Sequence, residues 1–271
     1  MSEPPPDHVF EITEGTLAQA SPRHAAQPRL EILGERALVP SPSAPNVLHA
    51  QAYRDLLGRM GAVTQRRNTA GVVIPDYAVR MAVLDFEHFP AGEDERAALI
   101  RFRLRKSVPF HIDESQVAYS VQIQEPERVE VLAVAIARPI LLEYESLFTD
   151  AGFRVGLVTP SSIAALPLCV TGESGLTLVA KLAGSTISIL VLEMKRVRLV
   201  RCLDLSTGEP ETVPPIDSVR DVLRQTFAYV EDQLGKRVSK LLLCGFGGET
   251  ETFGRLAERE FEVRYAAVRS R

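Results

Sequence analysis

The chain has 271 residues, of which 45% are hydrophobic and 24% charged, and its formal net charge is −4. This composition is typical of a soluble globular protein with one large domain or two moderate ones, and the charge gives no general attraction to nucleic acid or anionic lipid. The cysteines, Cys169, Cys202 and Cys244, lie far apart. Their spacing excludes a CxxC zinc site and a disulfide framework, and it suits a reducing cytoplasm.

Residues 1–7 are acidic and proline-rich, and they are predicted to form a disordered tail. They lack the basic start and apolar stretch of a secretory signal. The longest apolar passage, residues 129–142, is interrupted by Glu130, Arg138 and Pro139. Because crossing a bilayer takes ~20 apolar residues, we expect no membrane span.

The first third of the chain alternates short apolar strands with one helix. Asn46 follows a proline-rich loop and is predicted to cap that helix, which Gly61 stops. The strands are predicted at residues 9–12, 30–33, 72–74 and 81–86.

A basic amphipathic helix is predicted over residues 93–106. Ala97, Ile100 and Leu104 form its buried face, with acids at its start and Arg101, Arg103, Arg105 and Lys106 at its end, as the helix dipole favours. No aromatic platform accompanies this basic cluster, so it is interpreted as a solvated helix end rather than a nucleic-acid patch. Val108 precedes Pro109 and must be extended, which ends the helix.

Two strands and a helix follow. Residues 116–123 alternate, with Val117, Tyr119, Val121 and Ile123 on one face, and the apolar run 129–137 is predicted to be the buried partner strand. Pro139 opens the second helix, which ends at Gly152.

Residues 172–175 are the best candidate boundary between two α/β parts. Beyond it lie a predicted three-stranded meander (176–180, 186–193 and 197–203) and a long helix capped by Asp217. A buried strand, 240–244, ends in a glycine cluster, and a last helix runs from about 250 to 259. Each part opens with a meander of strands, but the two are not repeats in sequence.

The block from Val72 to Leu168 carries a family resemblance. Its strand ends in Pro75, its basic helix closes with Ser107-Val108-Pro109-Phe110, and its last segment runs from Asp150 to Leu166. In order and spacing, this block resembles the PilM family, the actin-like assembly proteins of bacterial type IV pilus machines. The resemblance implies an α/β, actin-like (ribonuclease H-like) fold with two halves. Residues 8–172 would form the first half, with a small α+β subdomain inserted at about 84–157, and residues 173–271 the second.

In actin-like ATPases, the nucleotide lies between the halves, and two turns hold its phosphates. The first pattern is an acid, an apolar residue, a glycine, small polar residues and a lysine. It aligns with residues 11–18, where Thr13 replaces the glycine, Ala18 replaces the lysine and Glu14 adds a carboxylate. Coulomb repulsion and the missing cation both oppose triphosphate binding.

The second phosphate turn aligns with residues 181–186. Lys181 replaces the acid that would organise magnesium, and Ala183 replaces the glycine, although Gly184 can restore a turn one residue later. The adenosine-side turn keeps Gly245, Gly247 and Gly248, which would be the nucleotide-binding residues. The alternative is a structural turn between strand and helix. ATP is therefore not expected as a cofactor, and no residue is assigned to catalysis or to a metal.

The resemblance also implies a partner. PilM-like proteins lie at the cytoplasmic face of the inner membrane, bind the N-terminal tail of a PilN-like single-span membrane protein and link that platform to assembly and retraction motors. The cytoplasmic part of the type II secretion protein GspL is similar. Val108, Pro109 and Phe110 are the candidate groove residues, since such a groove needs apolar surface and unpaired backbone groups. The alternative is that Phe110 packs under its own helix.

Two function classes remain open. One is a non-catalytic scaffold of a pilus assembly platform, and the other is an actin-like ATPase or sugar-kinase relative with atypical phosphate loops. The altered phosphate turns favour the scaffold.

Overall fold

The computed structural model describes residues 5–21, 28–33, 36–60, 69–169, 174–206 and 214–268. The chain divides into two compact units. The first comprises residues 1–80, 101–117 and 135–164, and the second comprises residues 81–100, 118–134 and 165–271. Residues 81–100 and 118–134 of the predicted insert thus belong to the same unit as the C-terminal part of the chain, whereas the residues that flank them in sequence belong to the first unit. Among the described helices, none is long and apolar enough to cross a membrane.

The first unit is built on a five-stranded mixed sheet in the order β3-β2-β1-β4-β8. β1, β2 and β3 form an antiparallel meander, β4 pairs parallel to β1, and β8 pairs parallel to β4. The sequence did not predict β2. The strands are β1 His8–Ile12, β2 Thr16–Ala20, β3 Arg29–Ile32, β4 Thr69–Ile74 and β8 Arg154–Pro160.

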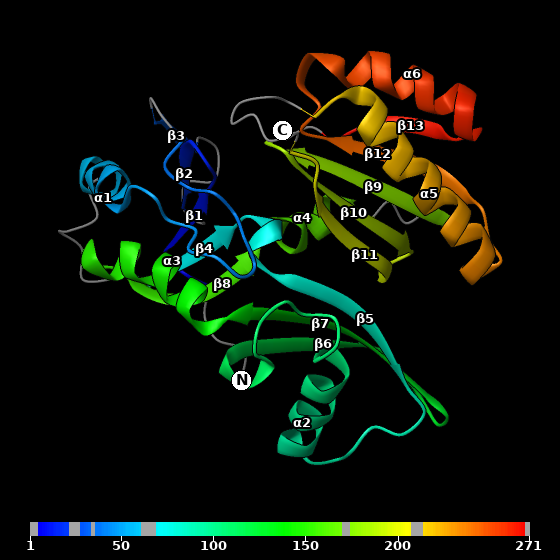
Figure 1. Ribbon diagram of the computed structural model, residues 1–271, viewed down its shortest axis with the longest axis horizontal. Coiled ribbons are helices and arrows are strands. Elements are labelled where there is room, and N and C mark those ends of the chain that lie inside the picture. The colour runs from blue at the N-terminus through cyan, green and yellow to red at the C-terminus, as the bar shows by residue number, and fades with distance from the viewer. Residues whose placement is uncertain are drawn as a thin grey trace. The chain divides into compact units, whose positions relative to one another are not determined.

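The second unit contains a sheet of the same design, in the order β11-β10-β9-β12-β13 (Figure 1). It again opens with an antiparallel meander, followed by two parallel strands. The two sheets therefore share one strand order and one pattern of directions, although their sequences are not repeats. The strands are β9 Leu176–Ala183, β10 Thr186–Glu193, β11 Arg196–Asp204, β12 Val238–Cys244 and β13 Arg264–Ala267.

Between β4 and β8 the chain forms a three-stranded sheet, β5-β7-β6, and helix α2. This is the predicted small α+β subdomain. Ile100 and Leu104 of α2 are fully buried, as predicted. The predicted alternation along β6 fails at Val121, which is 37% exposed. The elements are β5 Arg80–Phe86, α2 Glu93–Leu104, β6 Ser115–Glu125 and β7 Arg128–Ala137.

Helices α1 (Ala50–Arg59), α3 (Arg138–Asp150) and α4 (Ser161–Cys169) complete the surroundings of the first sheet. An aromatic cluster fills the core here, with the ring centroids of Phe10 and Phe153 4.9 Å apart and those of Phe10 and Phe148 5.1 Å apart. Such pairs contribute area burial and edge-to-face attraction together.

Two expectations about this unit were wrong. Asn46 does not cap α1, which begins at Ala50. It is buried in the preceding loop, where its side-chain NH₂ donates to the carbonyls of Ser41 and Ala44 and its side-chain oxygen accepts from Tyr144. Asp7, predicted to be disordered, donates its backbone N–H to Thr69 Oγ1 at 3.0 Å and accepts from that hydroxyl at 2.7 Å. Residues 1–4 lie outside the described part.

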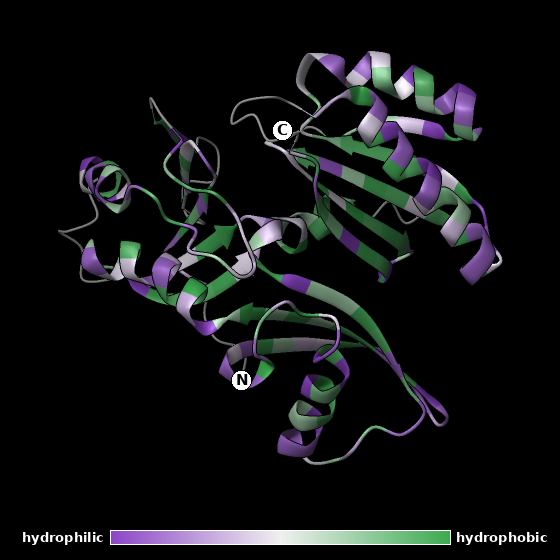
Figure 2. Ribbon diagram, in the orientation of Figure 1, coloured by the Kyte–Doolittle hydropathy of each residue, from purple (hydrophilic) through white to green (hydrophobic). Residues whose placement is uncertain are grey.

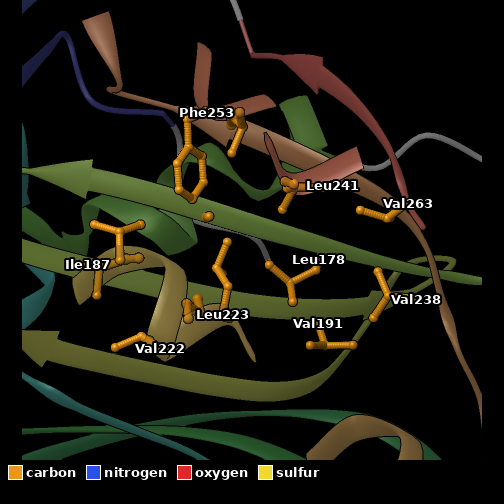
Figure 3. Packing of buried hydrophobic residues seen from close by; sticks show 14 of the residues in the cluster. Leu178, Ile187, Val191, Val222, Leu223, Val238, Leu241, Phe253 and Val263 are labelled. Carbon is orange, nitrogen blue, oxygen red and sulfur yellow. The ribbon is translucent and has the colours of Figure 1, made fainter. Parts of the chain in front are cut away.

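The core of the second unit lies between its sheet and two helices, α5 (Ile216–Leu234) and α6 (Thr250–Phe261). Alternate residues of β9, β10 and β12 face α5 residues such as Leu223 and α6 residues such as Phe253, as Figure 3 shows. In Figure 2, β9 and β10 are green along most of their length, whereas α6 alternates between purple and green. Helix α5 begins one residue before Asp217, and Pro215 occupies the cap position predicted for that acid.

Candidate functional site

The first candidate phosphate turn is the hairpin between β1 and β2. Thr13 and Thr16 close it: the Thr13 N–H donates to the Thr16 carbonyl at 3.0 Å, and the Thr16 N–H donates to Thr13 Oγ1 at 3.1 Å. Ala18 lies in β2 directly across from Glu11 of β1. The aligned residues therefore form a hairpin that the sequence did not predict, and the aligned lysine position lies within a strand.

Other residues of the first unit contact this turn. Glu14 forms an ion pair with Arg36 at 2.7 Å, and the carbonyl of Glu14 accepts from the Ala37 N–H. The Tyr53 hydroxyl donates to the Thr13 carbonyl at 2.5 Å, and burial, with Glu14 nearby, raises the pKa of Tyr53 well above its usual value. The carboxylate that the sequence placed against phosphate is thus paired with an arginine, whose positive charge offsets the expected repulsion.

Sequence reasoning missed a polar cluster at the carboxyl ends of the parallel strands β1, β4 and β8. Asp76, only 3% exposed, accepts the backbone N–H of Ser162 at 2.7 Å and its hydroxyl at 2.5 Å. The Ser161 hydroxyl donates to Glu11 at 2.9 Å. Ser161 and Ser162 begin α4, so Asp76 fixes the start of that helix. Each of these polar residues lies at or just beyond a parallel strand end, which is the signal that could have revealed them.

The second candidate phosphate turn is the β9–β10 hairpin. Ala183 pairs with Thr186, so Gly184 and Ser185 form a two-residue turn, with Gly184 at φ 56°. A glycine at the first position is typical of a tight hairpin turn. Gly184 restores the turn that Ala183 cannot make, while Lys181 remains within β9 between Ser188 and Cys244.

The third turn follows β12 and holds the predicted nucleotide-binding glycines. Gly245 has φ 79°, and a Cβ there would lie 2.0 Å from the Leu182 carbonyl oxygen. Gly247 has φ 53°, whereas Gly248 has open space around its Cβ position. Packing against β9 therefore explains Gly245 without a ligand. Gly247 is explained by its positive φ, which favours glycine. Gly248 has neither a positive φ nor a close neighbour that would exclude a side chain.

Gly248 also lines a cavity of about 520 Å³ beside α6. Two basic side chains line it, Arg255 and Arg259, which come from successive turns of that helix, and Arg255 pairs with Glu251. Within the described residues, no group of three or more histidine, cysteine, aspartate or glutamate side chains is placed to hold a metal ion.

The predicted partner loop follows α2 in the first unit. Val108 and Phe110 are half-buried and Pro109 is exposed. None of the hydrogen bonds between described residues involves the backbone of these three residues, whereas Arg101 donates to the carbonyls of Ile112 and Ser115 just beyond them. The loop is therefore anchored on its far side and offers its own backbone groups for pairing.

No family model and no curated protein matches the sequence. Solved structures do match. The "PilM-PilN type IV pilus biogenesis complex" is similar with a TM-score of 0.71 and 16% identity, over 96% of this chain and 87% of that chain. A Bacteroides thetaiotaomicron protein with an actin-like ATPase fold and unknown function gives a TM-score of 0.57 and 13% identity, over 96% and 90%.

A third match is the cytoplasmic domain of EpsL, an inner membrane component of the type II secretion system of Vibrio cholerae. Its TM-score is 0.50 at 14% identity, over 87% of this chain and 80% of that chain. At such identities the similarity defines the fold. The chain has an actin-like α/β fold, and the predicted resemblance to PilM-like proteins is confirmed at that level.

Proposed function

We propose that this chain is a non-catalytic scaffold of a type IV pilus assembly platform at the cytoplasmic face of the inner membrane. It would bind the N-terminal tail of a PilN-like membrane protein and link the platform to the assembly and retraction motors. The observation that carries the proposal is the backbone similarity to the PilM–PilN complex over 96% of the chain.

The loop at 108–110 supports the tail-binding part. An extended peptide gains affinity from main-chain hydrogen bonds and from pockets for its side chains. Val108 and Phe110 supply apolar surface here, and their backbone groups have no hydrogen-bond partner among the described residues. Proline at 109 lacks an N–H, so the loop cannot continue the helix that precedes it.

The two phosphate turns support the non-catalytic part. At the first turn, Ala18 supplies no cation, and the cation that is present, Arg36, is held in an ion pair with Glu14. At the second, Lys181 cannot hold a metal ion. The alternative is a component of a type II secretion platform, and the similarity to the EpsL cytoplasmic domain supports it.

The test is binding of a synthetic peptide of a PilN-like cytoplasmic tail to the full chain, measured by calorimetry. We expect wild type to bind, and F110A to weaken binding at least tenfold while its melting temperature stays within about 2 °C. F102A, an exposed phenylalanine earlier in the same segment, is the matched control and should bind like wild type. If wild type binds no such tail, the scaffold proposal fails. If F110A unfolds the protein, Phe110 is a core residue.

A further inference from the structure

Phe102 differs from the other phenylalanines of the chain because its side chain is exposed. The chain has 11 phenylalanines, and Phe102 is 68% exposed whereas all the others are buried or half-buried. An exposed apolar side chain forgoes the ~1.5–3 kcal/mol that burial would contribute. Single exposed apolar residues are common, so the surroundings of Phe102 decide what it means.

Those surroundings are basic. From Arg96 to Ile112 the chain has five arginines and lysines and no aspartate or glutamate. Arg103, Arg105 and Lys106 are exposed around Phe102. The acids of α2, Glu93, Asp94 and Glu95, are confined to its first turn. Only the C-terminal end of the helix therefore combines positive charge with an exposed aromatic ring.

Helix geometry places these side chains on one surface. The Arg105 N–H donates to the Arg101 carbonyl at 3.0 Å, so helical geometry continues through residue 105. At about 100° per residue, Phe102 points roughly opposite the mean direction of Ile100 and Leu104, which are fully buried. Arg105 and Lys106 follow Phe102 by three and four residues and flank it. We call Phe102, Arg105 and Lys106 the Phe102 patch.

The helix dipole accounts for basic residues at this end, but not for the phenylalanine among them. The ion pair between Arg105 and Asp113 is long, at 3.5 Å, and its side chains are 60% and 77% exposed, so it neutralises little of the charge. An aromatic ring among arginines and lysines is the combination that anchors proteins at the surface of an anionic bilayer. A ring that protrudes from the outer side of a helix suits such a surface better than it suits a peptide, which binds in a groove.

We propose that the Phe102 patch is a lipid-contacting surface, in which Phe102 enters the headgroup region of an anionic membrane and Arg105 and Lys106 bind its phosphates. This contact is with lipid itself and goes beyond the proposed binding of a protein tail. It would give the chain a weak membrane attachment of its own and orient the adjacent 108–110 loop toward the bilayer. Each basic side chain near such a surface strengthens binding about fivefold.

The experiment uses the absence of tryptophan from the chain. F102W places a single fluorescent reporter in the patch. With protein-free vesicles containing phosphatidylglycerol, we expect a blue shift of its emission and co-sedimentation of the full chain. Neither should occur with neutral phosphatidylcholine vesicles, and high salt should reverse both. The R105E/K106E variant, with its charges reversed, should lose at least tenfold in binding, and F102A should lose several-fold.

The β10–β11 turn provides a matched control, because Met194 is 63% exposed and is followed by the exposed Lys195. M194W should show no blue shift, and M194A/K195E should bind vesicles like wild type. The proposal is overturned if wild type does not sediment with anionic vesicles, or if the patch and control variants bind equally. It is also overturned if F102A loses binding of an acidic peptide while vesicle binding is unchanged. The vesicles contain no protein, so failure here leaves the tail-binding proposal intact.

Discussion

The side-chain amide of Gln122 pairs with the backbone of Val197 as a neighbouring strand would. Its Nε2 donates to the Val197 carbonyl at 2.9 Å, and its Oε1 accepts the Val197 N–H at 2.8 Å. Gln122 lies in β6 of the inserted subdomain, and Val197 lies in β11, the edge strand of the second sheet. An exposed edge is a template for unwanted pairing, and this amide covers part of it.

A buried carboxylate lies beside this contact. Glu130 of β7 is 1% exposed and lies 3.2 Å from Arg128 and 3.5 Å from Arg198 of β11. Arg198 also binds Glu193 at 2.6 Å. A charge stays buried when it is paired, and Glu130 is paired both with Arg128 of its own strand and with Arg198 of β11. These contacts explain why residues 118–134 group with the second unit.

We predict that Q122A lowers the free energy of unfolding by about 1–3 kcal/mol, because it leaves both backbone groups of Val197 without their partner. Urea denaturation measures this change. Q51A is the control, since Gln51 is exposed and its side-chain amide donates to Asp55 of its own helix, and it should change stability by less than about 0.5 kcal/mol. Equal effects of the two variants would show that the Gln122 contact contributes nothing.

The sequence predicted the strands of the second meander and the elements of the insert from apolar periodicity, and the family resemblance implied that those elements form an inserted subdomain. It missed β2, since Thr16–Ala20 is made of small and polar residues in which only Leu17 is fully buried. It also placed Val121 on the buried face of β6, but Val121 is exposed. The neighbouring residue, Gln122, instead faces the protein, where its side chain bonds to the Val197 backbone.

Local sequence patterns do not predict which residues far apart in the sequence come into contact. Asp76 and Ser162 are separated by 86 residues, and only their shared position just beyond parallel strand ends relates them in the sequence. The three glycines after β12 were predicted as a group, and only the structure separates their roles. Gly245 is required by its close approach to Leu182, whereas Gly248 is not constrained.

That difference gives a second prediction. G245A should destabilise the protein by at least about 3 kcal/mol, because the residue has φ 79° and its Cβ would clash with a backbone oxygen. G248A, three residues on, should cost less than about 0.5 kcal/mol. Thermal or urea unfolding of the two variants is the measurement. A stable G245A protein would mean that the β12 turn can move away from β9.

The third prediction concerns pH. Lys236 and then Arg198 and Arg196 lower the pKa of Glu193 below its usual value. A carboxyl group whose pKa is lower in the folded state stabilises the fold above its unfolded pKa of about 4.3, and that contribution is lost as the pH falls through the folded value. Wild type should therefore lose more stability than E193Q between pH 6 and pH 3. E231Q, in an exposed pair with Arg237, is the control and should follow wild type. Parallel wild-type and E193Q curves would contradict the prediction.

The last prediction is that millimolar Mg-ATP does not stabilise this chain. A ligand at a hundred times its dissociation constant adds ~2.7 kcal/mol to the free energy of unfolding, which for a protein of this size raises the melting temperature by roughly 5–10 °C. We expect a shift below about 1 °C, because Ala18 supplies no cation at the first turn, Glu14 holds Arg36 in an ion pair there, and Lys181 stands in place of the metal-organising acid. Thermal shift with Mg-ATP, with magnesium alone as the control, measures it. A rise of several degrees that requires ATP would show that the chain binds nucleotide through other residues, and the non-catalytic proposal would have to be abandoned if hydrolysis accompanied it.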